Sequence, residues 1–328
     1  MEEPVGEPAV PADHEILSRY RGLQIASIVM IAAGLLIPTV VVAGNADILS
    51  AAAPDAVERL LGPLLLLFLG GLLLLAGLIS NAVRAVIVRR KLSPERYRGP
   101  AVIVLLLLAV IVGTVLALGA GGTALALYDG GELSVGGTLL LLTSTQIGLL
   151  TVAGALVVAP KALAGVRLVP PSGLLRSMLI GLAISVPAWV MATLLAAAAA
   201  LALEALGFTQ ELGVLDAVLD RGDPTVVLVA FVLVAPVAEE LFFRGVVYNA
   251  WLRERGPRAA LYGSAALFAA IHTSLFSLVP IFALGVALAL VYRSTRSLPA
   301  AMAMHSGFNA ISVAITLLAR QGILQLPT

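Results

Sequence analysis

Two adjacent carboxylates and an arginine interrupt an apolar stretch in the C-terminal half of the chain. The sequence from 231 to 245 reads Phe-Val-Leu-Val-Ala-Pro-Val-Ala-Glu-Glu-Leu-Phe-Phe-Arg-Gly. Ionisable groups inside an apolar span cost about 2.5 to 3.5 kcal/mol each on insertion scales, so they normally face the bundle interior and have a function. Glu240 and Arg244 have the spacing of an ion pair on one helix face. Glu239 lies about 100° around the helix without such a partner, which leaves it available as a general base.

Two of the three histidines follow these acids within apolar segments. His272 comes four residues after Phe268, so both lie on one helix face. His305 precedes Asn309 by the same spacing. Glu239 with His272 could hold and deprotonate a water, while His305 and Asn309 could donate hydrogen bonds to the oxyanion formed when that water attacks a peptide carbonyl. The residue types therefore favour peptide hydrolysis without a covalent intermediate.

A zinc-dependent version of the same hydrolysis fits the residues equally well. One glutamate and two histidines are a common set of three protein ligands for hydrolytic zinc, with water in the fourth position. Glu239, His272 and His305 would then be the metal ligands, and the protein would be a metalloprotease. The sequence leaves open whether the site uses no cofactor or zinc.

The composition indicates that the chain lies in a lipid bilayer rather than in water. Of the 328 residues, 60% are hydrophobic and 12% are charged, which is far from the balance of a soluble domain. We therefore expect the lipid bilayer as a partner, together with a peptide or membrane-protein substrate. The net charge of +1 indicates no nucleic acid partner. Cysteine is absent, which excludes disulfides, thiolate metal sites and cysteine nucleophiles.

The elements that must position the polar residues are transmembrane helices, and the predicted fold class is an all-α polytopic transmembrane bundle of about eight or nine spans. The apolar segments are continuous rather than alternating, which disfavours a membrane barrel. A spanning helix needs roughly 20 apolar residues. The eighth candidate is short for a span, which is why eight is the alternative count. The expected spans are 22–44, 61–83, 101–127, 138–159, 174–203, 225–250, 258–276, 278–292 and 298–319.

Basic residues in the loops predict the orientation, and a helix-stopping segment predicts the domain boundary. The loop from Arg84 to Arg98 carries the most Lys and Arg, which are retained on the cytoplasmic side. The N-terminus is then cytoplasmic and the C-terminus external. Leu-Val-Pro-Pro-Ser-Gly at 168–173 stops helices. We therefore expect a cytoplasmic tail at 1–21, an accessory transmembrane half of about four helices at 22–172, and a catalytic half at 173–328.

Three short motifs occur in order on consecutive hydrophobic segments. They are Glu-Glu-x-x-x-Arg at 239–244, Phe-x-x-x-His at 268–272 and His-x-x-x-Asn at 305–309. This set resembles the CAAX protease and bacteriocin-processing (CPBP) family of intramembrane proteases, which includes the type II CAAX prenyl endopeptidase. The resemblance covers roughly residues 174 to 315. It implies a CPBP-like protease domain in the C-terminal half.

The resemblance also implies roles for the residues of the motifs. It implies that Glu239 and His272 activate the water and that His305 and Asn309 stabilise the oxyanion. Glu240 and Arg244, with Phe268, would support the site structurally. The abundance of Ala, Leu, Gly and Arg suggests a GC-rich bacterial genome and hence a bacterial plasma membrane. A membrane-embedded peptide, a leader or a bacteriocin-like substrate is then more plausible than a prenylated protein.

Two interpretations without catalysis remain open. A transporter or channel could use Glu239, Glu240 and the histidines as a proton or cation relay. A degenerate relative could bind a peptide without cutting it, as an immunity protein would. The complete set of motifs favours an enzyme over both.

Overall fold

The computed structural model of the chain is almost entirely helical. Its only strands within the described residues are β1 (Tyr128–Asp129) and β2 (Glu132–Leu133), which form one antiparallel pair. The predicted all-α class is confirmed. The structure describes residues 13–44, 56–89, 91, 97–121, 128–129, 132–133, 135–158, 173–209, 219, 226, 228–272 and 274–324.

Each expected span overlaps a helical run in the described part of the chain. Five helices there are long and apolar enough to cross a membrane: α2 (Arg21–Gly44), α4 (Ala56–Arg89), α7 (Leu174–Ala205), α13 (Leu275–Thr295) and α14 (Leu298–Arg320). A short helix, α1 (Asp13–Arg19), precedes α2. Shorter apolar runs are α5 (Val102–Gly121), α6 (Val135–Ala153) continued by η2 (Gly154–Val158), and η5 (Ala259–Gly263) continued by α12 (Ser264–Ala270).

The helical run that carries the two glutamates changes its hydrogen-bond register along its length. It consists of the π-helix η3 (Leu228–Val234), α10 (Ala235–Glu240), the π-helix η4 (Leu241–Tyr248) and α11 (Asn249–Arg255). A π-helix pairs each carbonyl with the N–H five residues later, and such segments occur frequently at functional sites. The two glutamates therefore lie on a short α-helical piece between two π-helical ones.

Two expected spans have different lengths in the structure. Helix α13 starts three residues before the expected 278 and ends three residues after 292, so it is long enough to span. Its limits follow from the backbone, which is extended at Ser274 and left-handed at Arg296 (φ 51°). The preceding run ends at Ala270 rather than at 276, because the chain turns at His272.

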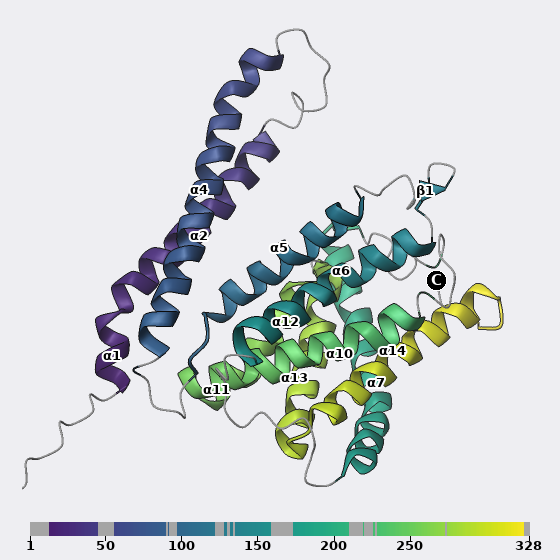
Figure 1. The fold of residues 1–328 in the computed structure, drawn as a ribbon. Coiled ribbons are helices and arrows are strands. Elements are labelled where there is room, and N and C mark those ends of the chain that lie inside the picture. Colours follow the sequence, from purple (N-terminus) through teal and green to yellow (C-terminus); the bar gives the residue numbers. More distant parts are fainter. Residues whose placement is uncertain are drawn as a thin grey trace, which may run out of the picture. The chain divides into compact units, whose positions relative to one another are not determined.

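The chain divides into two compact units, Met1–Val104 and Leu105–Thr328. In the first, α2 and α4 pack along each other (Figure 1). They approach closely at glycines, and a Cβ on Gly34 would overlap the backbone of Leu74. Small residues let helix backbones meet in a membrane, where apolar side chains gain nothing by leaving lipid. The same unit contains a buried amide, Asn81, whose Nδ2 donates to Ser27 Oγ at 3.2 Å.

In the second unit, α6 packs against η3, α10 and η4, the run with the glutamates. This helix belongs to the half that we expected to be accessory. Residues 168–172 of the expected boundary lie outside the described residues, and the role of 22–172 stays a prediction.

Among the described helices of the second unit, α7 and α14 form the most extensive contact. One face of α7 carries small buried residues at intervals of four or fewer: Ser177, Gly181, Ser185, Ala188 and Ala192. A Cβ on Gly181 would overlap the carbonyl oxygen of Ala300 on α14, so only glycine permits this approach. Trp189 Nε1 also donates to Ser312 Oγ at 3.1 Å. This packing fixes α14, the helix that carries His305.

Candidate active site

The run Leu228–Arg255 places both glutamates and the arginine in the interior. Glu240 and Arg244 are fully buried, and Glu239 is 8% exposed. The predicted ion pair is present, with Arg244 Nη1 donating to Glu240 Oε1 at 2.9 Å. Arg244 Nη2 donates to the carbonyl of Gly285 on α13 at 3.0 Å. A buried arginine needs several acceptors, and these two bonds join the glutamate helix to α13.

Gly285 was not expected from the sequence. A Cβ at this position would lie 3.0 Å from the Cα of Ala265 on α12, so glycine allows α12 and α13 to approach. One indirect sign of it was present in the sequence. An arginine in an apolar span needs more acceptors than one carboxylate provides, so a second acceptor for Arg244 had to exist.

The ring of Phe268 lies at the centre of the site. The guanidinium carbon of Arg244 is 4.7 Å from the ring centroid, which is the geometry of a cation–π contact. The rings of His272 and His305 lie 4.9 and 5.7 Å from it, each edge to face. Phe268 thus contacts the arginine and both histidines of the site.

His305 lies between the two glutamates. Its Nδ1 is 3.0 Å from Glu240 Oε1, and its Nε2 is 4.0 Å from Glu239 Oε2. An ionised carboxylate can only accept, so Nδ1 carries a proton and donates it to Glu240. The separation between Nε2 and Glu239 exceeds a hydrogen bond. His305 therefore bonds directly to one glutamate and faces the other.

The end of its own helix fixes the ring of His272. The backbone N–H of His272 donates to the carbonyl of Ala269 at 3.1 Å, so the last turn is tighter than an α-helix. The backbone N–H of His272 therefore does not bond to the carbonyl of Phe268, as it would in an α-helix. The imidazole ring of His272 bonds to this carbonyl instead, with Nδ1 at 2.8 Å. A carbonyl only accepts, so Nδ1 carries the proton, and Nε2 of the neutral ring is an acceptor.

Asn309 bonds to the π-helix upstream of the glutamates. Its Nδ2 donates to the carbonyl of Phe231 at 2.7 Å. In a π-helical register this carbonyl would pair with the nitrogen of Pro236, which has no hydrogen. The side chain of Asn309 supplies the missing donor. A primary amide has two N–H donors, so this bond uses one of them.

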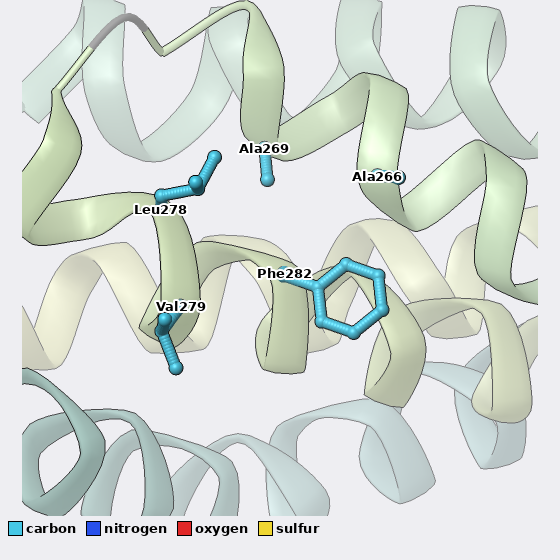
Figure 2. A pocket seen from close by; sticks show the side chains of 5 residues that line it. All are labelled: Ala266, Ala269, Leu278, Val279 and Phe282. Atoms are coloured by element: carbon cyan, nitrogen blue, oxygen red, sulfur yellow. The ribbon is translucent and has the colours of Figure 1, made fainter. Parts of the chain in front are cut away.

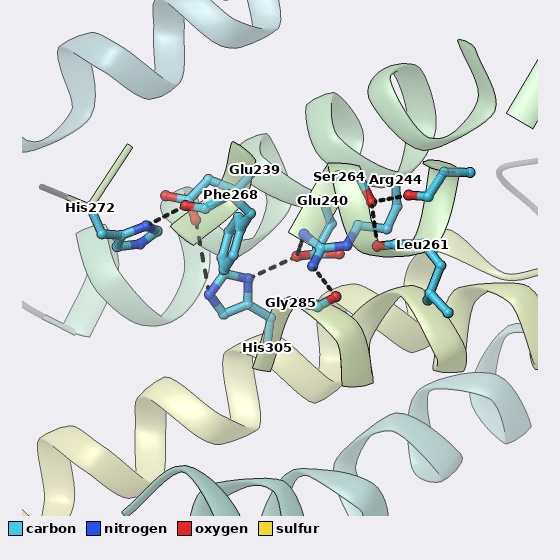
Figure 3. Close-up of polar contacts among 10 residues, drawn as sticks. Glu239, Glu240, Arg244, Leu261, Ser264, Phe268, His272, Gly285 and His305 are labelled. Atoms are coloured by element: carbon cyan, nitrogen blue, oxygen red, sulfur yellow. Dashed lines mark hydrogen bonds and ion pairs between the residues drawn. The ribbon is translucent and has the colours of Figure 1, made fainter. Parts of the chain in front are cut away.

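Figure 3 shows the site as a row of side chains, with His272 and Glu239 at one end, His305 between, and Arg244 with Gly285 further along. The structure brings six of the seven predicted site residues into one contact network: Glu239, Glu240, Arg244, Phe268, His272 and His305. The seventh, Asn309, donates to the carbonyl of Phe231 instead.

The residues proposed as zinc ligands do not form a metal site in this arrangement. Within the described ranges, no group of three or more His, Cys, Asp or Glu side chains is placed to hold a metal ion. Zinc ligands surround the metal at about 2.0 to 2.2 Å. His305 instead directs Nδ1 at Glu240, at 3.0 Å.

An apolar pocket of about 300 Å³ lies between α12 and α13 (Figure 2). None of the described residues that line it is titratable. Ala269, in its wall, precedes His272 by one helical turn. The pocket is lined by Ala266, Ala269, Leu278, Val279 and Phe282.

Comparison with known proteins identifies the family of this segment. Residues 221–311 match the family described as type II CAAX prenyl endopeptidase Rce1-like. The matched segment contains all three motifs, and it begins close to η3 and ends within α14. Neither the curated proteins nor the solved structures contain a match to the chain. Residues 221–311 are therefore an Rce1-like type II CAAX prenyl endopeptidase domain, as the three motifs indicated.

Proposed function

We propose that this protein is an intramembrane endopeptidase that hydrolyses a peptide bond with a water activated by Glu239 and His272. The observation that carries the proposal is the buried charged cluster, in which the Glu240–Arg244 pair supports His305 beside Glu239. Charges buried in an apolar bundle are costly and mark functional sites by default.

The attacking water loses one proton as its oxygen bonds to the carbonyl carbon. The carboxylate of Glu239 accepts this proton, and Nε2 of His272, which carries no proton in the neutral ring, holds the water by accepting its other hydrogen. When the tetrahedral intermediate collapses, the C–N bond breaks and Glu239 returns the proton to the leaving amine. The immediate products are a carboxylic acid and an amine, the proton of the acid then passes to the amine or to solvent, and no covalent enzyme intermediate forms.

The negative oxygen of the intermediate needs hydrogen-bond donors. His305 donates from Nε2 when both of its nitrogens are protonated, and Asn309 donates the amide hydrogen that Phe231 does not use. With His305 protonated, two carboxylates and two cations balance in the buried cluster. Glu240 and Arg244 keep His305 in place rather than contacting the substrate.

The substrate class that we propose is a membrane-embedded peptide or leader in a bacterial plasma membrane. This rests on the residue composition, whereas the family name refers to prenylated proteins. The distribution of arginines supports a cytoplasmic N-terminus and a scissile bond near the cytoplasmic leaflet. Cleavage restricted to prenylated peptides would contradict this choice of substrate.

The test is cleavage of a quenched fluorescent peptide library by purified protein in liposomes. Wild type is compared with Glu239→Ala and His272→Ala, each with and without a strong chelator. The expected result is cleavage by wild type, loss in both variants and no effect of the chelator. Loss on chelation with recovery on zinc addition would instead establish the metal-dependent version. Cleavage unaffected by either substitution would remove Glu239 and His272 from the proposed site. No cleavage at all would favour a peptide-binding protein or a transporter over a peptidase.

A further inference from the structure

The π-helix η4 is bonded from outside its own backbone by Asn249. Nδ2 of this residue donates to the carbonyl of Arg244 at 2.7 Å and to that of Gly245 at 3.0 Å. Where a π-helix returns to α-helical register, one carbonyl is passed over and has no backbone partner. Asn249, the first residue of α11, stands at this transition and supplies the donor.

Tyr292 on α13 completes this contact. The same Nδ2 donates to the Tyr292 hydroxyl oxygen at 2.8 Å, so two N–H groups serve three acceptors. Tyr292 is buried, and it lies seven residues after Gly285, which accepts from Arg244. Residues seven apart share a helix face. One face of α13 therefore holds η4 at two points, once through the side chain of Arg244 and once through Asn249.

This arrangement determines where the side chain of Arg244 points. A change of one residue in helical register turns a side chain by about 100° around the axis. If η4 relaxed to an α-helix, Arg244 could not keep its bonds to both Glu240 and Gly285. His305 would in turn lose the fixed position of its acceptor, Glu240.

We propose that Asn249 and Tyr292 are positioning residues that hold Leu241–Tyr248 in π-helical register and so align Arg244, Glu240 and His305. Neither residue belongs to the three motifs. The inference rests on the proposed function, because it assigns these residues an effect on the rate of hydrolysis. They act through Arg244 and do not touch the substrate.

The kinetic test compares kcat and KM for Asn249→Ala, Asn249→Ser and Tyr292→Phe on whichever library peptide the wild type cleaves. We expect Asn249→Ala to lower kcat about tenfold with KM nearly unchanged, the size expected for a lost hydrogen bond of about 1.4 kcal/mol. Serine can donate to the carbonyl four residues earlier and should recover part of the rate. Tyr292→Phe removes one of three acceptors and should cost about threefold.

Ser27→Ala is the matched control. It also removes an interhelical hydrogen bond between two side chains, that of Asn81, but between α2 and α4 of the first unit rather than on η4. Its kcat should equal that of the wild type. In an Arg244→Lys background, Asn249→Ala should cost less than twofold, because the residue through which it acts has already changed. Additive losses would contradict the proposed coupling.

Amide hydrogen exchange tests the same inference without activity. Peptides covering 241–255 should exchange faster in Asn249→Ala than in wild type, and Ser27→Ala should leave them unchanged. If Glu239→Ala retains cleavage, the proposed function fails. The exchange measurement alone then decides whether Asn249 holds Leu241–Tyr248 in π-helical register. If Glu239→Ala is inactive while Asn249→Ala has normal kcat and normal exchange, the positioning role is wrong and the proposed function stands.

Discussion

The two units of the chain bury polar groups in different ways. In the first, Asn81 donates to Ser27 and accepts from the N–H of Ala101 at 3.3 Å, so both ends of a neutral amide are used. In the second, Glu240 Oε2 and Arg244 Nε are buried without a hydrogen-bond partner among the described residues. A satisfied neutral group holds helices together at little cost, whereas charged groups with unsatisfied atoms persist where chemistry requires them. This is the contrast that we expect between a structural and a functional buried site.

The sharpest test of this contrast is Glu239→Gln. The amide keeps the size of the side chain but cannot accept a proton, so we expect kcat to fall by about 10² to 10⁴-fold. The thermal unfolding temperature in detergent should stay close to that of the wild type. Activity within tenfold of the wild type would remove Glu239 from the role of base.

Arg244→Met tests the charged cluster as a structural unit. It leaves the Glu240 carboxylate buried without its cation, and breaking such a pair costs about 3 to 5 kcal/mol. Thermal unfolding in detergent measures this loss. Adding Glu240→Gln removes the second charge and should recover part of the stability. A double variant as unstable as the single one would show that packing, not charge, is responsible.

Gly181→Ala tests whether the contact of α7 with α14 fixes the site. The added methyl group overlaps the carbonyl of Ala300, so a backbone must move, at a cost of about 1 to 3 kcal/mol. Because α14 carries His305, cleavage should fall together with stability. Gly71→Ala on α4 is the matched control, since nothing lies within 4 Å of its Cβ. Equal behaviour of the two variants would contradict the close approach.

Asn81→Ala should have the smallest effect. It removes the neutral pair of the first unit and should lower the free energy of unfolding by about 1 kcal/mol. The rate of cleavage per folded molecule should not change, because this amide takes no part in the proposed mechanism. A reduced kcat in a variant that is fully folded would give the first unit a role in catalysis.

Much of the fold was predictable because lipid imposes a simple rule on the sequence. Runs of about 20 apolar residues must form helices, since every backbone polar group has to be satisfied within the segment. The Glu240–Arg244 pair was predictable for a similar reason, because its spacing lies within one helix. The resemblance in the three motifs was confirmed over residues 221–311.

The remaining features depend on contacts between segments distant in the sequence. The position of His305 between the glutamates requires the packing of α14, and Gly285 contributes a carbonyl that no side-chain pattern reveals. The π-helices were missed because their register depends on donors elsewhere, namely Asn309 for η3 and Asn249 for η4. Pro236, which lacks an N–H, was the one local sign of an irregular helix.

The hydrogen bond between Asn309 and Phe231 couples the position of the proposed oxyanion donor, Asn309, to that of the proposed base, Glu239. Phe231 lies eight residues before Glu239 on the same helical run, so a displacement of Asn309 would be transmitted to the base. A substrate that pulls on the oxyanion donor would thereby also shift Glu239. The hydrogen bond between Asn309 and Phe231 then sets the distance between the proposed oxyanion donor and the proposed base. A substrate carbonyl that binds at the wrong depth would strain this bond.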